Sequence, residues 1–318
     1  MGFFVWSRPC MADENFSAGL VSIVIPTFNQ ASYLAEALTS VTKQTYNDWE
    51  AIVVNNFSTD ETSDLVLGWD DSRVRLVNFA NNGIIAESRN LAISQARGEF
   101  IAFLDSDDTW EESKLSKSVD VLRAGSDLVC HAERWFGGGT RDRVVRYGPA
   151  SRSTYDSLLL DGNCISTSAV VVRHDVLERV GKFRTHPNFV TTEDYDLWLR
   201  ISQGGYKISF IDEVLGSFRR HASSASSATT RHLYAELAVL EDHFAKYPKG
   251  NTRSLTNRKA LAHYTAGRSF SKNSKFREAC GAFLTSLKMN PLHFRTWIGL
   301  CVCIAEWLMH PVKRRGRG

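Results

Sequence analysis

The sequence predicts an α/β fold, in which helices flank a mostly parallel, doubly wound sheet, followed by a small α-helical C-terminal region. Up to about residue 220, short apolar runs alternate with segments of helical spacing, the pattern of parallel strands joined by right-handed crossovers. After about residue 230 only helical spacing recurs. We expect four units: a disordered N-terminus at 1–19, an α/β domain at 20–221, a Ser/Ala-rich linker at 222–230 and helices at 231–318.

Composition narrows the functional classes. The chain has 318 residues, 43% of them hydrophobic, enough for one large domain and a smaller one. A net charge of +3 does not indicate a nucleic-acid partner. The six cysteines lack paired zinc-ligand spacing and the opening residues do not form a signal peptide, so we expect a cytoplasmic protein.

The first half alternates strands and helices. Apolar runs predict strands at 20–26, 49–54 and 74–77, and helical spacing follows each of them. Pro26 ends the first strand, and Thr27 to Asn29 form the loop after it. We expect the helix after the third strand to run from about 84 to 96 and to end with Gly98 in the C′ position.

The segment 100–104 is five apolar residues long and is followed at once by Asp105-Ser106-Asp107-Asp108. A run without polar alternation predicts a strand buried on both faces, and ligands of open α/β sheets bind where such strands end. Three adjacent carboxylates repel one another unless a divalent cation or a ribose lies among them. The alternative is that they only cap the next helix, with Thr109 and Glu112 as a capping box.

The second half adds strands near 128–131, 168–172, 208–211 and 214–218. Gly137 to Gly139 predict a hairpin or lid. Glu193 and Asp194 begin a helix, and the helix dipole favours negative charge at that end. These two acids could therefore serve only to stabilise the helix. No G-x-G-x-x-G follows the first strand, which disfavours a dehydrogenase and leaves a metal to hold any phosphate.

Together these motifs resemble the inverting family 2 glycosyltransferases of the GT-A fold. The resemblance covers residues 21 to 221 and rests on segments in a fixed order: Val24-Ile25-Pro26-Thr27-Phe28-Asn29, Asn55-Asn56, Arg89-Asn90, Asp105-Ser106-Asp107-Asp108, Glu193-Asp194 and Arg219-Arg220-His221.

The resemblance implies a role for each site residue. Asp107, with His221, would hold Mn²⁺ or Mg²⁺ on the donor diphosphate, and Asp105 would contact the ribose. Asp194 would be the general base, and Glu193 would bind the acceptor or position Asp194. The nucleotide-sugar would be bound by the remaining members of the set, which are Pro26, Thr27, Asn29, Asn56, Arg89, Ser106 and Arg219.

One segment departs from the family pattern, because Asn55-Asn56-Phe57 stand where two aspartates and a glycine are usual. An aspartate there would accept the imino hydrogen of uracil, whereas an asparagine both accepts and donates hydrogen bonds. UDP is therefore the expected nucleotide of the donor, but the asparagines do not select uracil as strictly. Phe57 either stacks on the base or packs in the core.

The C-terminal helices resemble a tetratricopeptide repeat at Gly267, Phe270, Ala279, Phe283 and Pro291. One repeat cannot bury its own face, so it should pack on the α/β domain, on a partner or on a second copy in a homo-oligomer. The apolar helix at 294–309 is too short to span a bilayer, and it either caps the repeat or lies in the membrane interface, assisted by the basic residues 313–317.

The expected function is transfer of a sugar from a nucleotide-diphosphate donor to a hydroxyl of a glycan, lipid-linked or other acceptor, in cell-surface polysaccharide synthesis. The expected setting is the cytoplasm, at the inner face of the membrane if the last helix binds lipid. The alternative is an inactive sugar-nucleotide-binding or scaffolding protein that acts through its helical repeat.

Overall fold

The computed structural model describes residues 16–139, 141–221, 228–247 and 251–309. Its sheet has the strand order β3-β2-β1-β4-β8-β6-β9-β5, and β7 pairs with β6. The strands are β1 (Ser17–Thr27), β2 (Trp49–Asn55), β3 (Val74–Asn78), β4 (Gly98–Phe103), β5 (Thr109–Trp110), β6 (Leu128–Gly137), β7 (Arg143–Val145), β8 (Val170–Arg173) and β9 (Ile208–Arg220).

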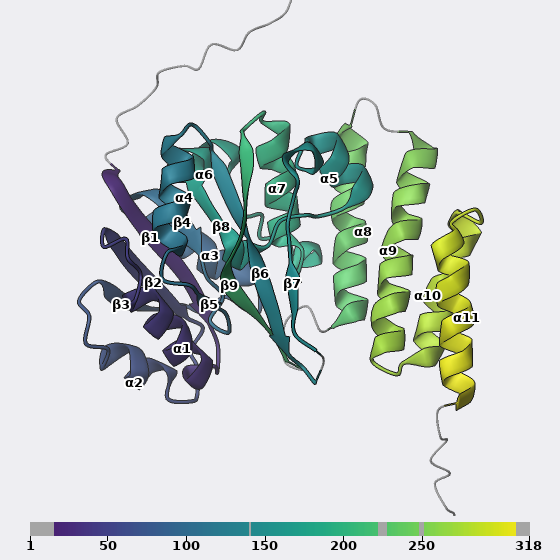
Figure 1. Cartoon of the computed structure of the whole chain (residues 1–318), viewed down its shortest axis with the longest axis horizontal. Coiled ribbons are helices and arrows are strands. Elements are labelled where there is room, and N and C mark those ends of the chain that lie inside the picture. The colour runs from purple at the N-terminus through teal and green to yellow at the C-terminus, as the bar shows by residue number, and fades with distance from the viewer. Residues whose placement is uncertain (1–15, 140, 222–227, 248–250, 310–318) are drawn as a thin grey trace, which may run out of the picture.

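Helices follow most of the strands, and after β9 the described chain forms only helices, α8 to α11 (Figure 1). The α-helices are α1 (Ala31–Thr42), α2 (Thr62–Leu67), α3 (Ile85–Gln95), α4 (Lys114–Arg123), α5 (Tyr155–Asp161), α6 (His174–Val180), α7 (Glu193–Gln203), α8 (Thr229–Lys246), α9 (Thr252–Lys272), α10 (Phe276–Met289) and α11 (Phe294–Met309). Short 3₁₀ helices lie at η1 (Ala150–Arg152), η2 (Thr167–Ala169) and η3 (Pro187–Phe189).

The mostly parallel sheet predicted from the sequence is confirmed. Strands β3, β2, β1 and β4 are mutually parallel, and β6 is parallel to β9. Strand β8 is antiparallel to both β4 and β6, and so joins the two parallel groups. The carboxyl ends of β1 and β4 therefore lie side by side at one edge, which is where the acidic loop was expected.

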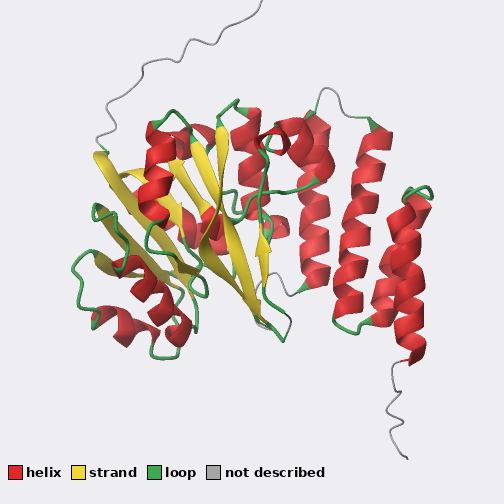
Figure 2. Ribbon diagram, viewed as in Figure 1, coloured by secondary structure: helices red, strands yellow, loops and turns green. Residues whose placement is uncertain are grey.

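The central strands are buried on both faces, as their unbroken apolar runs predict. In β4, Ile101 and Phe103 pack with α3, α5, α6 and α7, whereas Phe100 and Ala102 pack with α1, α2 and α4 on the other face. Figure 2 shows these strands between the two helical layers, with the later helices to one side. This α/β/α sandwich holds the strand ends, and the loops that leave them, in fixed positions.

Three local expectations are wrong. Gly98 does not end a helix but begins β4, and it is a glycine there because a side chain would come within 2.5 Å of the Leu20 carbonyl oxygen. Thr109 lies in β5 and α4 begins only at Lys114, so Thr109 and Glu112 do not form a capping box. The two closing strands predicted after residue 207 are one strand, β9, with an irregular register opposite His131 and Ala132 of β6.

The predicted unit boundaries shift as well. Strand β1 begins at Ser17, inside the segment expected to be disordered, and residues 1–15 lie outside the described residues. Helix α8 begins at Thr229, inside the expected linker, of which residues 222–227 lie outside the described part. The apolar face of α8, with Val239, Leu240 and Phe244, belongs to the same core as β4 and α7. The first C-terminal helix is thus part of the α/β unit.

Candidate active site

A pocket of about 840 Å³ opens where β1 and β4 end. Its size falls within the ~300–1,000 Å³ typical of ligand sites. Several segments far apart in the sequence contribute to its wall: the loop after β1, the acidic loop after β4, the N-terminus of α7 and the first turns of α8. Of the residues expected at the site, those in the wall are Pro26, Thr27, Asn56, Arg89, Asp105, Ser106, Asp107, Glu193 and Asp194.

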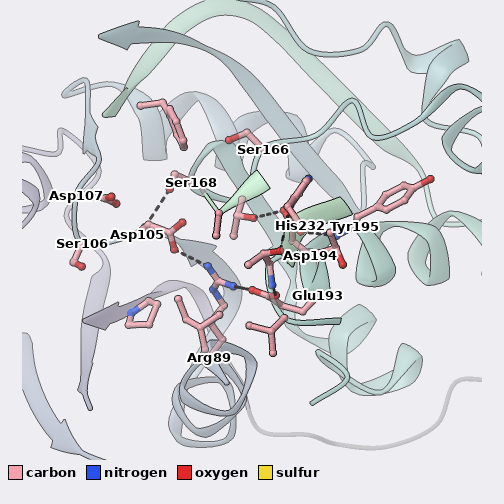
Figure 3. Close-up of a pocket in the computed structure, with 18 of the residues that line it drawn as sticks. Arg89, Asp105, Ser106, Asp107, Ser166, Ser168, Glu193, Asp194, Tyr195 and His232 are labelled. Atoms are coloured by element: carbon pink, nitrogen blue, oxygen red, sulfur yellow. Dashed lines mark hydrogen bonds and ion pairs between the residues drawn. The ribbon is translucent and has the colours of Figure 1, made fainter. Parts of the chain in front are cut away.

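Arg89 connects the two groups of acids (Figure 3). From the buried face of α3, one guanidinium nitrogen donates to Asp105 and another donates to Glu193, each at 2.7 Å. Burial lowers the pKa of Arg89, but the carboxylates of Asp105 and Glu193 outweigh it and hold that pKa above its ordinary value. The guanidinium is therefore a permanent cation that fixes the acidic loop relative to α7.

Glu193 and Asp194 are neighbours in the first turn of α7, but their surroundings differ. Glu193 is buried, and its second carboxylate oxygen accepts the Thr191 N–H at 2.7 Å. Burial raises the pKa of Glu193, Arg89 opposes that shift and Asp194 adds to it. The Asp194 carboxylate is only half-buried, and it accepts a hydrogen bond from Thr167 Oγ1 at 2.9 Å and another from the Tyr195 N–H. Of the two acids, both of which line the pocket, Asp194 is the more exposed.

The acidic loop directs its three carboxylates differently. Asp105 is partly exposed and forms an ion pair with Arg89. Asp107 Oδ2 instead lies 2.7 Å from His221 Nε2, just after the end of β9. Burial and the charge of Asp105 raise the pKa of Asp107, and His221 opposes that shift. Asp108 is buried away from the pocket, where its Oδ1 accepts the Arg219 N–H and burial holds its pKa well above the ordinary range.

These residues fit a divalent cation. The repulsion between Asp105 and Asp107 is the unfavourable term that a cation would remove, and carboxylate oxygens are the ligands that Mg²⁺ and Mn²⁺ prefer. His221 adds an imidazole beside Asp107.

Three expected residues lie outside the pocket wall: Asn29, Arg219 and His221. The Asn29 side chain accepts a hydrogen bond from the Thr59 N–H and so connects the loop after β1 to the loop after β2. Arg219 donates to the Asp107 carbonyl oxygen and to Glu36, and its guanidinium stacks between the rings of Tyr33 and Phe136. In this conformation Asn29 and Arg219 brace the loops around the pocket.

The three residues that differ from the family pattern, Asn55, Asn56 and Phe57, lie in three different surroundings. Asn55 is buried, and its amide group bonds with Ser58, Ser63 and Asn78, which makes it part of the fold. Asn56 lines the pocket, and its Oδ1 accepts the Asn81 N–H at 3.0 Å. Phe57 is 59% exposed, so it is not a core residue.

Sequence reasoning missed four residues at the site: Trp135 in β6, Tyr147 after β7, and Thr167 and Ser168 in η2. Thr167 and Ser168, in η2, bond Asp194 and the backbone N–H of Asp105, respectively. Trp135 and Tyr147 also line the pocket, and the Tyr147 hydroxyl donates to buried Glu133 at 2.5 Å. No sequence pattern marks Thr167 and Ser168, since single hydroxyl residues near a strand are common.

Helix α8 also supplies three residues of the wall: Arg231, His232 and Glu236. His232 Nδ1 lies 3.2 Å from Thr191 Oγ1, beside the acids of α7 (Figure 3). Our sequence analysis assigned α8 to a separate helical unit, and that is why these residues were not considered.

A second cluster of possible metal ligands, Asp196, Asp242 and His243, lies away from the pocket. Arg184 and Arg200 both bind Asp196, and Arg184 also binds Asp242. Burial opposes ionisation of Asp196, but hydrogen bonds from His243 and Arg184 hold its pKa far below the ordinary value. Two arginines already neutralise this cluster, which therefore joins α7 to α8 and needs no metal.

Comparison with known proteins identifies relatives of this chain. The model of the family described as Glycosyl transferase family 2 matches residues 22–181. A UDP-Glc:alpha-D-GlcNAc-diphosphoundecaprenol beta-1,3-glucosyltransferase, WfgD of Escherichia coli, is 33% identical over 75% of this chain and 91% of its own length. A putative teichuronic acid biosynthesis glycosyltransferase, TuaG of Bacillus subtilis, is 30% identical over 71% and 91%.

Among solved structures, residues 1–349 of S. aureus TarS in complex with UDP-GlcNAc superpose with a TM-score of 0.63. The match covers 92% of this chain and 93% of the other at 17% identity. At that identity the similarity concerns the fold, which is the GT-A fold, and it extends into the C-terminal helices.

Proposed function

The chain belongs to glycosyl transferase family 2, and from that premise we propose that it transfers a sugar from a UDP-sugar to a hydroxyl of a glycan or lipid-linked acceptor, with inversion. One observation carries the proposal. In a single pocket, the acidic loop Asp105 to Asp107 faces the half-buried Asp194, and Arg89 bridges the two sides.

The donor's nucleotide is assigned to the crevice formed by the loops after β1 and β2. Pro26, Thr27 and Phe28 line it, and Phe28 is 52% exposed, so its ring is available to a base. Asn56 Oδ1 can accept the imino hydrogen of uracil in place of the usual carboxylate, if the Asn81 N–H shares it. UDP-sugars in the names of WfgD and of the TarS complex are consistent with this choice.

Mn²⁺ or Mg²⁺ would be held by Asp107, with Asp105 and His221 beside it. When bound, the cation would stabilise the negative charge that develops on the departing diphosphate. Arg89 cannot substitute for it, because both of its terminal nitrogens are bonded to carboxylates.

Asp194 is the proposed general base. The acceptor oxygen forms the new bond to the anomeric carbon, the bond to the phosphate oxygen breaks with its electron pair, and the hydroxyl proton passes to Asp194. Each carboxylate oxygen of Asp194 accepts one hydrogen bond and keeps a second lone pair for that proton. Glu193 is buried and ion-paired with Arg89, so its proposed role is to position Arg89 and, with it, the acidic loop.

The acceptor would enter beside α8, where Arg231 and His232 line the wall near Asp194. A basic side chain there suits a phosphorylated acceptor, and the name of WfgD specifies a diphosphate-linked lipid. We therefore place the reaction in cell-surface polysaccharide synthesis, at the cytoplasmic face of the membrane.

A panel of sugar nucleotides tests this function. In Mn²⁺, we expect UDP to raise the melting temperature more than GDP or dTDP, and one UDP-sugar to be turned over. Asp107→Ala should weaken nucleotide binding and remove most of its response to Mn²⁺, as calorimetry would measure. Metal-insensitive binding by both proteins would refute the metal site, and tight UDP binding without any transfer would favour the inactive binding protein.

A further inference from the structure

Helix α11 has its apolar side on the outside. Its three buried residues are Thr296, Leu300 and Cys303, which face α9 and α10. Most of the opposite side is exposed and apolar, with Arg295 and Glu306 at its margin; at helical spacing its apolar residues are Phe294, Trp297, Ile298, Cys301, Val302, Ala305, Leu308 and Met309. We call these eight residues the outer face of α11.

The outer face of α11 is unusual for a helix at the edge of a protein, where the exposed side is normally polar. In Figure 1, α11 is drawn in yellow at the end of the molecule farthest from β1. Leu308 is 83% exposed and Phe294 is 72% exposed, so these side chains are not shielded by the described residues. A continuous apolar stripe of this length indicates a surface that something covers.

We propose that the outer face of α11 docks on the surface of an anionic lipid bilayer. Among the described residues no helix could span a bilayer. With its apolar side outward along its length, α11 would lie flat in the interface. The sequence places four basic residues directly after α11, at Lys313, Arg314, Arg315 and Arg317. Such a run is complementary to anionic headgroups, each basic residue adding roughly fivefold to binding. A second copy of the chain would offer the same basic run and would repel it.

A tryptophan of the outer face supports this occupant. Trp297 lies near the start of α11 and is about half exposed. Indole rings are enriched at the headgroup level of membranes because they combine an apolar body with a polar N–H.

The docking does not depend on the proposed function, because it follows from the outer face of α11 and from the basic run after it.

Vesicle flotation of the full chain tests the docking. We expect flotation with phosphatidylcholine vesicles that contain phosphatidylglycerol, weak flotation with phosphatidylcholine alone, and loss of binding at high salt. Ile298→Ser with Leu308→Ser should weaken binding by a factor on the order of ten or more. Leu67→Ser is the matched control, because Leu67 is 74% exposed on α2, far from α11, and should leave flotation unchanged.

Other outcomes overturn the proposal. Equal flotation of the α11 variant and wild type would show that the outer face does not bind lipid. A concentration-dependent dimer in sedimentation that the α11 variant abolishes, without vesicle binding, would assign the face to a second copy. Calorimetry of UDP binding separates this from the proposed function: the α11 variant should bind UDP as wild type does, whether or not it binds vesicles.

Discussion

Arg89 shows how much of the site depends on one buried side chain. The pattern of the sequence marked it for the base or the phosphates, but its guanidinium bonds with Asp105 and Glu193. A motif identifies which residues meet, but it does not distinguish a residue that binds substrate from one that orders the others. The same holds for Arg219, which braces the acidic loop from outside.

Replacing Arg89 by Ala should be severely destabilising. Glu193 is buried and would lose its cation, a change that costs about 3–5 kcal/mol in free energy of unfolding. Arg146→Ala is the control, because Arg146 and Asp212 form an exposed ion pair worth less than ~1 kcal/mol. Urea denaturation measures both. A loss for Arg89→Ala no larger than that of the control would contradict the bridging role.

Glu133 should make stability depend on pH. Burial raises the pKa of its carboxyl from 4.5 to about 7. The folded state therefore holds a proton that the unfolded state releases, so the stability from this group is complete below about pH 4.5 and is lost as pH rises through 7. At pH 8, Glu133→Gln should be more stable than wild type by up to roughly 3 kcal/mol, with little gain at pH 4.5. Urea denaturation giving the same gain at both pH values would contradict this.

At the scale of elements, the sequence predicted the strands better than the helix boundaries. Unbroken apolar runs identified β1, β2 and β4, because a strand buried on both faces is apolar at every position and these runs are too short for a typical helix. The expected start of α4 was wrong, because the prediction relied on a capping hydrogen bond between Thr109 and Glu112. Thr109 instead pairs with Ser217 in a two-residue strand that no local pattern could reveal, since it depends on a residue 108 positions away.

Helices α9 and α10 offer a matched pair of glycines. A side chain on Gly267 would come within 2.7 Å of the Phe283 ring, whereas nothing lies within 4 Å of such a side chain on Gly281. Gly267→Ala should therefore cost roughly 1–3 kcal/mol by overpacking the helical pair. Gly281→Ala should gain about 0.5–1 kcal/mol from helix propensity. Thermal unfolding of both variants would contradict the packing if the two shifts had the same sign.

At the scale of the whole molecule, the candidate site and the first C-terminal helix, α8, belong to the same packed unit. Helix α8 packs into the core of the α/β unit and also lines the pocket, so the boundary expected at residues 222–230 does not separate the site from the helices. Composition marked that boundary, but composition cannot show that the helix after a linker folds back. The family and the fold were within reach of the sequence, because the family rests on motifs in a fixed order along the chain and the fold on alternating strand and helix patterns.

The central claim is that this pocket transfers a sugar with Asp194 as base. Asp194→Asn keeps the shape and the hydrogen bonds but removes the basic carboxylate. Asp175→Asn is the matched control, because Asp175 is also the second residue of a helix, α6, and is paired with Arg179 at the surface. Glu193→Gln tests the neighbouring acid, whose proposed role is positioning.

The measurement is single-turnover transfer from a UDP-sugar by Asp194→Asn, alongside UDP affinity and a folding check. We expect the rate to fall by a factor on the order of 10²–10⁴ with UDP affinity unchanged, while Asp175→Asn transfers at the wild-type rate. Transfer retained by Asp194→Asn and lost by Glu193→Gln would move the base to Glu193. Wild-type transfer by both variants would contradict the assignment of this acid pair as the catalytic centre.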